Sequence, residues 1–364
     1  MQNVYLDYNS TTPVFPDIKK KMEENIPNIP LNPSSVHKYG QIAREIIENA
    51  RYDILKAIFP KSHNEYSLIF TSSGSESNNL VINSFNNEVI LYSNIEHSSI
   101  IKPCEANDKS HTINVNKDGL IDIKFFASLV LKHKPKLISI MQANNEIGVI
   151  QDINKISKIC KENSVILHTD ASQSFGKIYC NFEDSLPDLI TISSHKIYGP
   201  IGASAVIFNK NVKLIPQILG GGQEFYKKSG TENVSAIYGF SLACNLAIDF
   251  FPKQYIKSKL LRDKIDEYAI LKKYKIVSKD ALRLPNTTLI VKQNSNTSKE
   301  IMMLDMKGIM ASGGSACSSG LYESNSILQK IFIPKEYQSC QIRFSLGICT
   351  LESDIDYLIN AYFK

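Results

Sequence analysis

The sequence predicts an α/β protein with a mainly parallel central sheet, helices on both faces, and a second, smaller α+β domain. Short apolar runs alternate with helical segments over most of the chain, and the connections between them are short. The chain has 364 residues and is 43% hydrophobic, which is enough to bury a large core. Because such sheets bind ligands beyond the ends of their strands, the polar residues that follow each apolar run are the candidate site residues.

The predicted elements follow this pattern in order. We expect strands at 67–70, 89–92, 136–141, 165–169, 189–193 and 203–208, and helices from about residue 76 and over 152–163. A long helix over 233–250 is expected to end at Pro252, because proline lacks the N–H that continues a helix. After it we expect a helix at 255–271, strands at 275–277, 288–291 and 342–345, and a terminal helix. These elements predict a large domain at 14–251 and a small domain at 252–364, joined by the segment 1–13.

Charge and composition favour a cytoplasmic protein. The net charge of +5 is small and dispersed, and the run 19–21 (Lys-Lys-Lys) is expected on a solvated helix face, so nucleic acid is not an expected partner. The N-terminus has no basic region followed by an apolar one, and we expect no apolar run of membrane-spanning length. A membrane partner is therefore not expected.

The seven cysteines point to the same compartment. They are odd in number and scattered, with no Cys-X-X-Cys pair, so neither a disulfide framework nor a zinc site is expected. Six of them are predicted to be small core residues. Cys317 differs because it lies in a loop of small residues, 311–320, which cannot bury it well. An exposed thiol in such a loop is reactive by placement; the alternative is a flexible turn with an unimportant cysteine.

A lysine and a carboxylate indicate a cofactor. Lys196 lies in the run 193–200 (Ser-Ser-His-Lys-Ile-Tyr-Gly-Pro), while Asp170 and Gln173 follow the apolar run 165–167. A pyridoxal phosphate enzyme needs a lysine amine for the Schiff base and a carboxylate that keeps the pyridine nitrogen protonated. Taken alone, Lys196 would be a solvated turn residue and Asp170 a helix cap. Together they make pyridoxal 5'-phosphate the expected cofactor.

Two loops have the character of phosphate sites. The segment 71–78 (Thr-Ser-Ser-Gly-Ser-Glu-Ser-Asn) joins a predicted strand to a helix, and backbone amides at a helix N-terminus bind phosphate. A simple capping box, with Ser73 or Ser75 as the cap, explains this segment equally well. A second glycine-rich loop runs from 220 to 232 and contains Thr231.

His97 and Arg343 complete the candidate residues. His97 follows a strand on the same sheet edge and can stack on a planar ring and move protons; a capping or core histidine is the alternative. Arg343 lies in the last predicted strand and can present a bidentate fork to a substrate carboxylate, with a surface salt bridge as the alternative.

This set of segments resembles the NifS/IscS-type cysteine desulfurases, in the class V group of fold-type I pyridoxal phosphate enzymes. The resemblance runs nearly end to end, through 5–9, 11–13, 32–35, 71–78, 96–97, 144–148, 170–173, 194–200, 229–233, 315–317 and 342–345. It implies the fold-type I transferase fold and a homodimer. It is highly specific for the family and less specific for the substrate.

The resemblance implies a role for each matching residue. Lys196 forms the Schiff base, Asp170 pairs with the pyridinium nitrogen, and Gln173 bonds the ring hydroxyl. His97 stacks on the ring and moves protons. The phosphate is held by Gly74, Ser75, Ser193 and His195, with Thr231 from the partner subunit. Asn145 and Arg343 take the substrate carboxylate, and Asn32 lines the site.

The implied reaction converts L-cysteine to L-alanine. Cys317 is similar to the family nucleophile, which takes the substrate sulfur as a persulfide and passes it to an acceptor protein. An iron-sulfur scaffold is one such acceptor, and thio-cofactor synthesis and tRNA thiolation are other destinations. Three alternatives stay open: a selenocysteine lyase, another class V enzyme, and a weakly active paralogue that serves as an interaction partner.

The chain departs from the family pattern in three places. Phe225 and Lys228 stand where the family has arginines, and a lysine is a poorer bidentate partner for phosphate or carboxylate. The segment 321–326 differs from the usual sequence after the cysteine loop. The chain ends at Lys364, where scaffold-binding members continue, so docking of a scaffold through a C-terminal extension is not expected.

Overall fold

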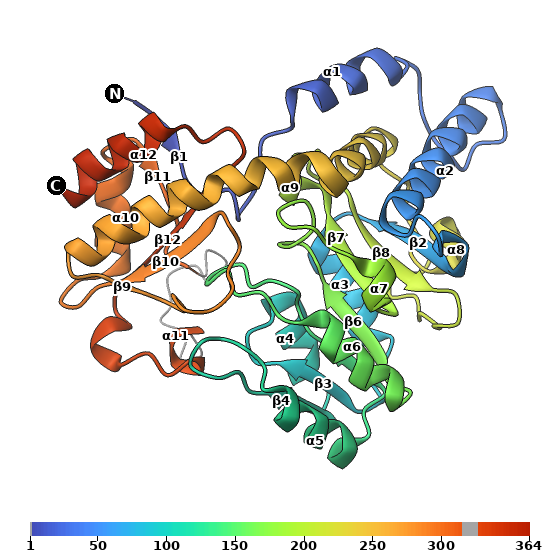
Figure 1. Ribbon diagram of the computed structural model, residues 1–364. Coiled ribbons are helices and arrows are strands. Elements are labelled where there is room, and N and C mark those ends of the chain that lie inside the picture. The colour runs from blue at the N-terminus through green and yellow to red at the C-terminus, as the bar shows by residue number, and fades with distance from the viewer. Residues whose placement is uncertain (1, 315–326) are drawn as a thin grey trace.

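The central sheet of the computed structural model, which describes residues 2–314 and 327–364, is mainly parallel, as predicted (Figure 1). Its seven strands lie in the order β2-β8-β7-β6-β5-β3-β4. Strand β8 runs antiparallel to both β2 and β7, and the other neighbours are parallel. The strands are β2 (Tyr66–Thr71), β3 (Ile90–Ser93), β4 (Ser110–Ile113), β5 (Leu137–Ser139), β6 (Ile166–Asp170), β7 (Leu189–Ser193) and β8 (Ser204–Asn209).

Helices cover both faces of this sheet because its strands are apolar on both sides. In β2, Leu68 and Phe70 pack into the core formed with α2 and α9, whereas Ile69 between them packs toward α3. Successive residues of a strand point to opposite faces, so one strand serves two cores. The helices of this part are α1 (Pro16–Asn25), α2 (Lys38–Ile58), α3 (Gly74–Asn83), α4 (Ser98–Glu105), α5 (Ile123–His133), α6 (Ile153–Glu162), α7 (Phe182–Ser185), α8 (Gln223–Tyr226) and α9 (Val234–Leu271).

The C-terminal part forms two small sheets. One is antiparallel with the order β12-β10-β9, and the other pairs β1 with β11 in parallel. The strands are β1 (Val4–Tyr5), β9 (Lys275–Ile276), β10 (Thr287–Val291), β11 (Ile309–Met310) and β12 (Gln341–Ser345); the helices are α10 (Thr297–Asp305), α11 (Ile327–Lys330) and α12 (Glu352–Leu358). Single helical turns lie at His63–Glu65, Ser194–Lys196, Lys335–Tyr337 and Ile359–Phe363. The domain boundaries at 14, 252 and 364 stay a prediction.

The N-terminal segment connects the two parts of the fold. Strand β1 pairs with β11, and both chain ends lie on the same side of the molecule (Figure 1). From there Asp7 bridges to Ser345 of β12, and Thr12 N donates to His195 O over 2.9 Å. Residues 7–12 therefore run from the C-terminal sheet to the end of β7.

The expected helix break at Pro252 is wrong. Helix α9 is continuous from Val234 to Leu271 with Pro252 inside it. A proline in a helix interior costs about 3 kcal/mol, so packing must outweigh it. Phe251 is fully buried and its ring lies 5.5 Å from that of Phe15, which anchors the helix next to the proline. Tertiary packing here overrides the local signal.

Helix α9 also corrects the expectation about apolar length. It contains an 18-residue window with a mean hydropathy of 1.5, which is long and apolar enough to span a membrane by composition alone. However, 56% of that window is buried inside the protein, where α9 packs against α1 and α2. This is the pattern of a core helix.

The prediction of six core cysteines is wrong in part. Cys104, Cys160, Cys244 and Cys340 are buried, whereas Cys180 is half-buried and Cys349 is exposed. Cys349 lies in the loop between β12 and α12, where no apolar periodicity fixes the direction of a side chain. Cys317 lies outside the described residues.

Candidate active site

The carboxyl ends of β6 and β7 place Asp170 and Lys196 at one edge of the sheet. Asp170 is the last residue of β6, and Ser193 is the last residue of β7. The two strands pair in parallel, so their ends meet. A single helical turn, Ser194–Lys196, follows β7, and Ile197 N closes it by donating to Ser194 O over 3.0 Å. This is the edge where the sequence analysis expected a ligand.

Lys196 and Gln173 converge on one carbonyl group. Lys196 Nζ donates to Asn9 O over 2.6 Å and to Ser10 O over 2.7 Å. Gln173 Nε2 donates to the same Asn9 O over 2.9 Å. A solvated turn lysine, which was the alternative for Lys196, does not describe this geometry. The amine and the amide N–H are held side by side.

Asp170 is joined to His97 by a chain of hydrogen bonds. Asp170 Oδ2 accepts from Asn78 Nδ2 over 2.8 Å, and Oδ1 accepts from Ser172 N over 2.9 Å. The second N–H of Asn78 donates to Ser99 Oγ over 2.9 Å. Ser99 Oγ lies 2.7 Å from His97 Nδ1. Because Ser99 Oγ accepts from Asn78, its hydroxyl proton is available for donation to His97 Nδ1, which completes the chain.

These contacts set the protonation of His97. Its Nδ1 accepts from Ser99 N over 3.2 Å, so His97 caps α4, as the alternative reading proposed. Burial lowers the pKa of His97, the Asp170 charge opposes this, and the Lys196 charge lowers it further. With Nδ1 acting as an acceptor, the proton of the neutral ring is on Nε2. The capping bond thus fixes the tautomer of His97, and it leaves the N–H at Nε2 available for a role at the site.

The start of α3 forms a cradle of small polar groups. Ser73 is the N-cap, and its Oγ accepts from Glu76 N over 3.2 Å, so the capping interpretation holds locally. A Cβ at Gly74 would lie 3.7 Å from Ser172 Oγ and 3.8 Å from Ser193 Cβ, which shows that the open side of Gly74 faces both serines. Ser193 Oγ is buried and lacks a hydrogen-bond partner among residues 2–314 and 327–364. A buried hydroxyl without a partner is costly unless a ligand satisfies it.

His195 is held neutral beside this cradle. Its Nδ1 lies 3.1 Å from Thr11 Oγ1, and its carbonyl accepts from Thr12 N and Thr12 Oγ1. Burial lowers the pKa of His195 to about 4, and the charges of Lys196 and Lys177 contribute to the shift. A neutral imidazole can still donate one N–H to an anion.

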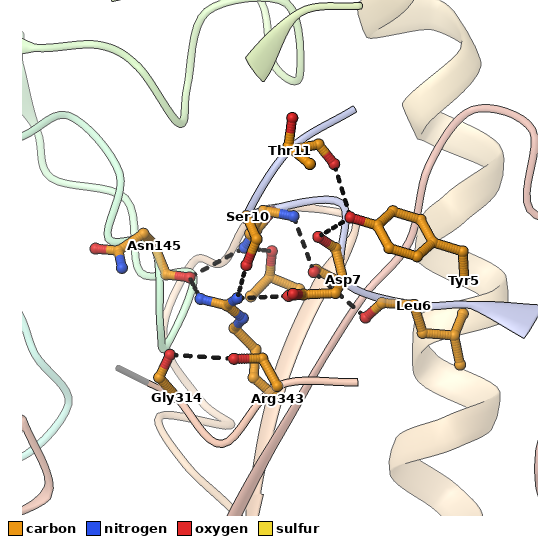
Figure 2. Close-up of polar contacts among 12 residues, drawn as sticks. Tyr5, Leu6, Asp7, Ser10, Thr11, Asn145, Gly314 and Arg343 are labelled. Carbon is orange, nitrogen blue, oxygen red and sulfur yellow. Dashed lines mark hydrogen bonds and ion pairs between the residues drawn. The ribbon is translucent and has the colours of Figure 1, made fainter. Parts of the chain in front are cut away.

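Arg343 is buried and oriented by three groups. Its Nη2 donates to Asp7 Oδ1 over 2.6 Å and to Ser10 Oγ over 2.9 Å, and its Nη1 donates to Asn145 O over 3.0 Å (Figure 2). The residue is 2% exposed, so the surface salt bridge considered as its alternative is wrong. Its Nε has no partner within the described part of the chain. Asn145 contributes its backbone oxygen to this arrangement.

The comparisons with known proteins agree with this geometry. The family model for class V aminotransferases matches residues 4–358. The chain belongs to the class V aminotransferase family. Enzymes of this family use pyridoxal phosphate, and the donor set described above fits that cofactor: an amine, a carboxylate at a strand end, and an unpartnered hydroxyl at a helix N-terminus.

Relatives of this class V protein share its length. Cysteine desulfurase IscS from Dictyoglomus turgidum is 38% identical, over 99% of this chain and 93% of the relative. A solved NifS-like protein from Rickettsia africae is 38% identical, with a TM-score of 0.91 and coverage of 99% and 98% of the two chains. A structure described as SspA in complex with cysteine is 27% identical, with a TM-score of 0.79 and coverage of 96% and 100%. The predicted resemblance to cysteine desulfurases is confirmed.

Two predicted residues of this class V protein, Asn32 and Thr231, lie in exposed loops. Asn32 is exposed, and its Oδ1 accepts from Ser34 N over 3.0 Å. Thr231 is also exposed. Both adjoin a cavity of about 320 Å³ whose lining includes Ser34 and Glu232. Gln223 joins the two loops, because its Nε2 donates to Ser34 Oγ and its Oε1 accepts from Gly230 N.

The sequence analysis missed residues that support the site. Asn9, Ser10 and Asn78 lie in or beside the motifs that carried the resemblance, but no role was assigned to them. The sequence did carry a signal for them: Asn9 and Ser10 are polar residues in the segment after β1, and Asn78 is a polar residue in the first half of α3. Lys177 gave a weaker signal, a lysine between the apolar residues Phe175 and Ile178. Cys317, the predicted nucleophile, lies outside the described residues.

Proposed function

We propose that this chain is a pyridoxal phosphate-dependent cysteine desulfurase that converts L-cysteine to L-alanine and takes the sulfur onto Cys317. The observation that carries the proposal is the convergence of Lys196 Nζ and Gln173 Nε2 on Asn9 O, at the sheet edge where Asp170 ends β6. The names of the full-length relatives and the cysteine in the SspA structure support the choice of substrate.

The cofactor contacts follow from this arrangement. Lys196 would provide the amine that binds the cofactor aldehyde, Asp170 would pair with the pyridine nitrogen, and Gln173 would donate to the ring oxygen. Bound pyridoxal phosphate withdraws electrons from the substrate α-carbon. His97 lies under the influence of both Asp170 and Lys196, which supports its placement against the ring.

The phosphate site combines α3 with the turn after β7. The backbone N–H groups at Gly74 and Ser75 lie in the first turn of α3, where the helix dipole favours an anion. Ser193 Oγ supplies a donor that lacks a partner in the described chain, and His195 supplies an imidazole N–H. Lys196, the next residue in the chain, adds a positive charge nearby, which lowers the pKa of His195.

Arg343 and Asn145 are the proposed contacts of the substrate carboxylate. The Arg343 guanidinium is already fixed by Asp7 and Ser10, so it loses little side-chain entropy when it binds an anion. Ser10 connects Arg343 to Lys196, because Ser10 Oγ accepts from Arg343 and Ser10 O accepts from Lys196 Nζ. This link supports a binding position for the substrate α-carbon between the Arg343 guanidinium and the Lys196 amine.

Proton and sulfur transfer are assigned to three residues. Lys196 Nζ accepts the α-proton of the substrate, and the neutral His97 has an N–H at Nε2 for a second proton transfer. The Cys317 thiolate attacks the substrate sulfur, and the bond between that sulfur and the β-carbon breaks. The sulfur becomes the outer atom of a Cys317 persulfide, and the carbon skeleton gains protons to become alanine. A thiol acceptor, such as a protein of iron-sulfur assembly, thio-cofactor synthesis or tRNA thiolation, then receives the sulfur.

A homodimer completes the proposal. Thr231 and Asn32 are exposed, and the residues that follow them in the chain, Glu232 and Pro33, line one cavity on the surface. Apolar side chains around the same loop are exposed: Ile218, Leu219, Phe225 and Tyr226. A two-fold interface that buries them would bring Thr231 to the partner's phosphate. The small net charge of the chain and the proposed sulfur-transfer reaction both fit a cytoplasmic protein.

The test of the proposal replaces Cys317. We expect Cys317→Ala to reduce alanine and sulfide formation from cysteine by at least about a thousandfold, while the Schiff-base absorption band remains. The matched control is Cys349→Ala, because Cys349 is an exposed thiol next to α12 and should leave both readouts unchanged. Near-normal desulfuration by Cys317→Ala would overturn the assignment, and a selenocysteine-specific reaction would then be favoured.

A further inference from the structure

Lys177 is a buried lysine that the reaction described above does not use. It is 1% exposed and belongs to the largest fully buried side chains. Its Nζ donates to Asn9 Oδ1 over 2.7 Å and to Gln173 Oε1. Both acceptors are neutral amide oxygens, and no ion pair within residues 2–314 and 327–364 includes Lys177. A buried amine without a carboxylate is costly and requires an explanation.

The backbone directs this side chain into the site. Gly176 has a φ of 79°, and a Cβ at this position would lie 2.9 Å from Ile197 Cγ2 and 3.2 Å from Ala247 Cβ. The turn is therefore pressed between α9 and the residue that follows Lys196. Lys177 N donates to Ser174 O over 3.0 Å, which fixes the turn.

The Lys177 amine fixes the orientation of both amides. Its N–H groups donate to the side-chain oxygens of Gln173 and Asn9, so those oxygens face it. Consequently Gln173 Nε2 faces Asn9 O. Asn9 Nδ2 faces Asn145 O over 3.1 Å and Thr287 Oγ1 over 2.9 Å.

We propose that Lys177 is a positioning residue, which holds Gln173 Oε1 so that Nε2 is presented to the ring oxygen of the bound cofactor. This inference rests on the proposed function, in which Gln173 contacts that oxygen. In pyridoxal phosphate the ring oxygen is attached next to the carbon that bears the aldehyde. A donor to it must therefore lie beside Lys196 Nζ, and Gln173 Nε2 shares the Asn9 O acceptor with that amine.

The charges around Lys177 suggest a competing explanation that the test must separate. Burial lowers the pKa of Lys177 well below its ordinary value, and the charges of Lys196 and Arg343 lower it further. Lys177 in turn contributes to the lowered pKa of His195. A direct effect of its charge on the Lys196 Schiff base would not require Gln173.

The experiment is a double-mutant cycle in the holoenzyme, read by titrating the Schiff-base absorption band and by the rate of cofactor release. A donor to the ring oxygen stabilises the anionic oxygen most after the imine proton has left. Losing that donor therefore raises the Schiff-base pKa. We expect Lys177→Met and Gln173→Ala each to raise it by about one pH unit and to speed cofactor release about tenfold. The double variant should go no further than either single one.

Two further variants guard against a purely structural effect. Lys177→Gln keeps an N–H donor without the charge and should stay close to the wild type, and it replaces Lys177→Met in the cycle if that variant does not fold. Lys161→Met removes a lysine that donates to Ser185 O away from the site, and it should change neither readout.

The outcomes separate this inference from the proposed function. Additive shifts in the double variant, or a shift in Gln173→Ala without one in Lys177→Met, would overturn the positioning role of Lys177 while leaving the cofactor assignment intact. An unchanged Gln173→Ala, or a wild type without a Schiff-base band, would overturn the proposed contacts of Gln173 and Lys196, and the inference with them.

Discussion

Two buried glutamates show how differently two regions of this molecule are built. Glu96 lies just after β3, and Glu224 lies in α8, a short turn with left-handed residues in the loop before α9; each is 5% exposed. Glu224 forms a bidentate pair with Arg51, with distances of 2.9 and 3.0 Å. Glu96 accepts only neutral donors, from Ser93 Oγ and Met141 N, and its Oε2 has no partner in the described chain.

The loop around Glu224 is held by charge. Glu224, Phe225 and Tyr226 all have left-handed backbone angles, with φ of 47°, 57° and 60°. Each such residue costs about 1–2 kcal/mol, and the bonds from Arg51 and Phe70 N to the buried Glu224 carboxylate offset that cost. Phe225, which stands where the family has an arginine, places its ring 4.8 Å from the Arg51 guanidinium. An arginine at that position would face a like charge.

The cofactor region is held instead by hydrogen bonds that converge on Asn9, donated by Gln173, Lys177 and Lys196 and not by an ion pair. The contrast is that the cofactor region is held by contacts within one chain, whereas the segment around Glu224 is a platform, braced by the Arg51 pair, that leads to the exposed Thr231. In the proposed dimer, that platform would present Thr231 to the phosphate site of the partner subunit.

The largest expected effect is the loss of activity in two variants and its recovery in mixed dimers. This complementation tests whether each active site uses residues of both chains. Lys196→Ala and Thr231→Asp should each abolish desulfuration, the first by removing the Schiff-base amine and the second by repelling the cofactor phosphate. Mixed dimers contain one site with both wild-type residues, so co-expression should restore activity to about a quarter of the sites. The measurement is alanine formation, with the fraction of mixed dimers quantified by differently tagged chains.

The control for complementation pairs Lys196→Ala with Asp170→Asn. These residues lie at the ends of neighbouring strands in one chain, so no mixed dimer has an intact site and no activity should return. Activity of Thr231→Asp alone, or mixed dimers that stay inactive, would contradict the shared site.

The next effect concerns stability and compares two partners of one arginine. Arg51 pairs with Glu224, whose side chain is 1% exposed, and with Glu48, whose side chain is 59% exposed. We expect Glu224→Gln to lower the free energy of unfolding by about 3–5 kcal/mol, because it leaves the buried Arg51 charge with only the exposed Glu48 as a carboxylate partner. Glu48→Gln should cost less than about 1 kcal/mol. Urea denaturation measures both, and equal losses would contradict the account of a charge-braced platform.

Much of the fold was predictable because its signals are local. Strands β2, β6, β7 and β12 were expected within about one residue at each end, since apolar runs followed by polar turns define them. The continuity of α9 through Pro252 was not predictable, because it depends on Phe251 packing against residues far away in the chain. The apolar periodicity of a segment indicates which of its faces is buried, but it does not indicate which other elements cover that face.

The candidate site divides in the same way. Lys196, Asp170 and Gln173 were found because each follows a strand end, where parallel topology gathers side chains. Asn9 escaped notice because its importance lies in its contacts with Lys177, Gln173 and Lys196, which are at least 160 residues distant in sequence. A polar residue of that kind is indistinguishable in the sequence from an ordinary turn residue.

The pH-dependent effect uses the buried Glu96. Burial raises the pKa of Glu96 to about 8, the bonds from Met141 and Ser93 oppose this, and Asp170 raises it further. The folded protein therefore retains a proton that the unfolded chain loses near its ordinary pKa of 4.5. Stability from this group is complete below that pH and declines as the pH rises toward 8, by up to about 1.4 kcal/mol per pH unit.

Glu96→Gln cannot titrate and should remove that decline. The difference in unfolding free energy, variant minus wild type, should therefore rise between about pH 5 and 8 and level off above pH 8. Taking the difference cancels the opposite contribution of His97 and His195, whose lowered pKa values add stability as the pH rises. The exposed Glu88→Gln is the control and should give a flat difference. A flat curve for Glu96→Gln as well would mean that Glu96 is as well compensated as Glu224, and the contrast between the two regions would fail.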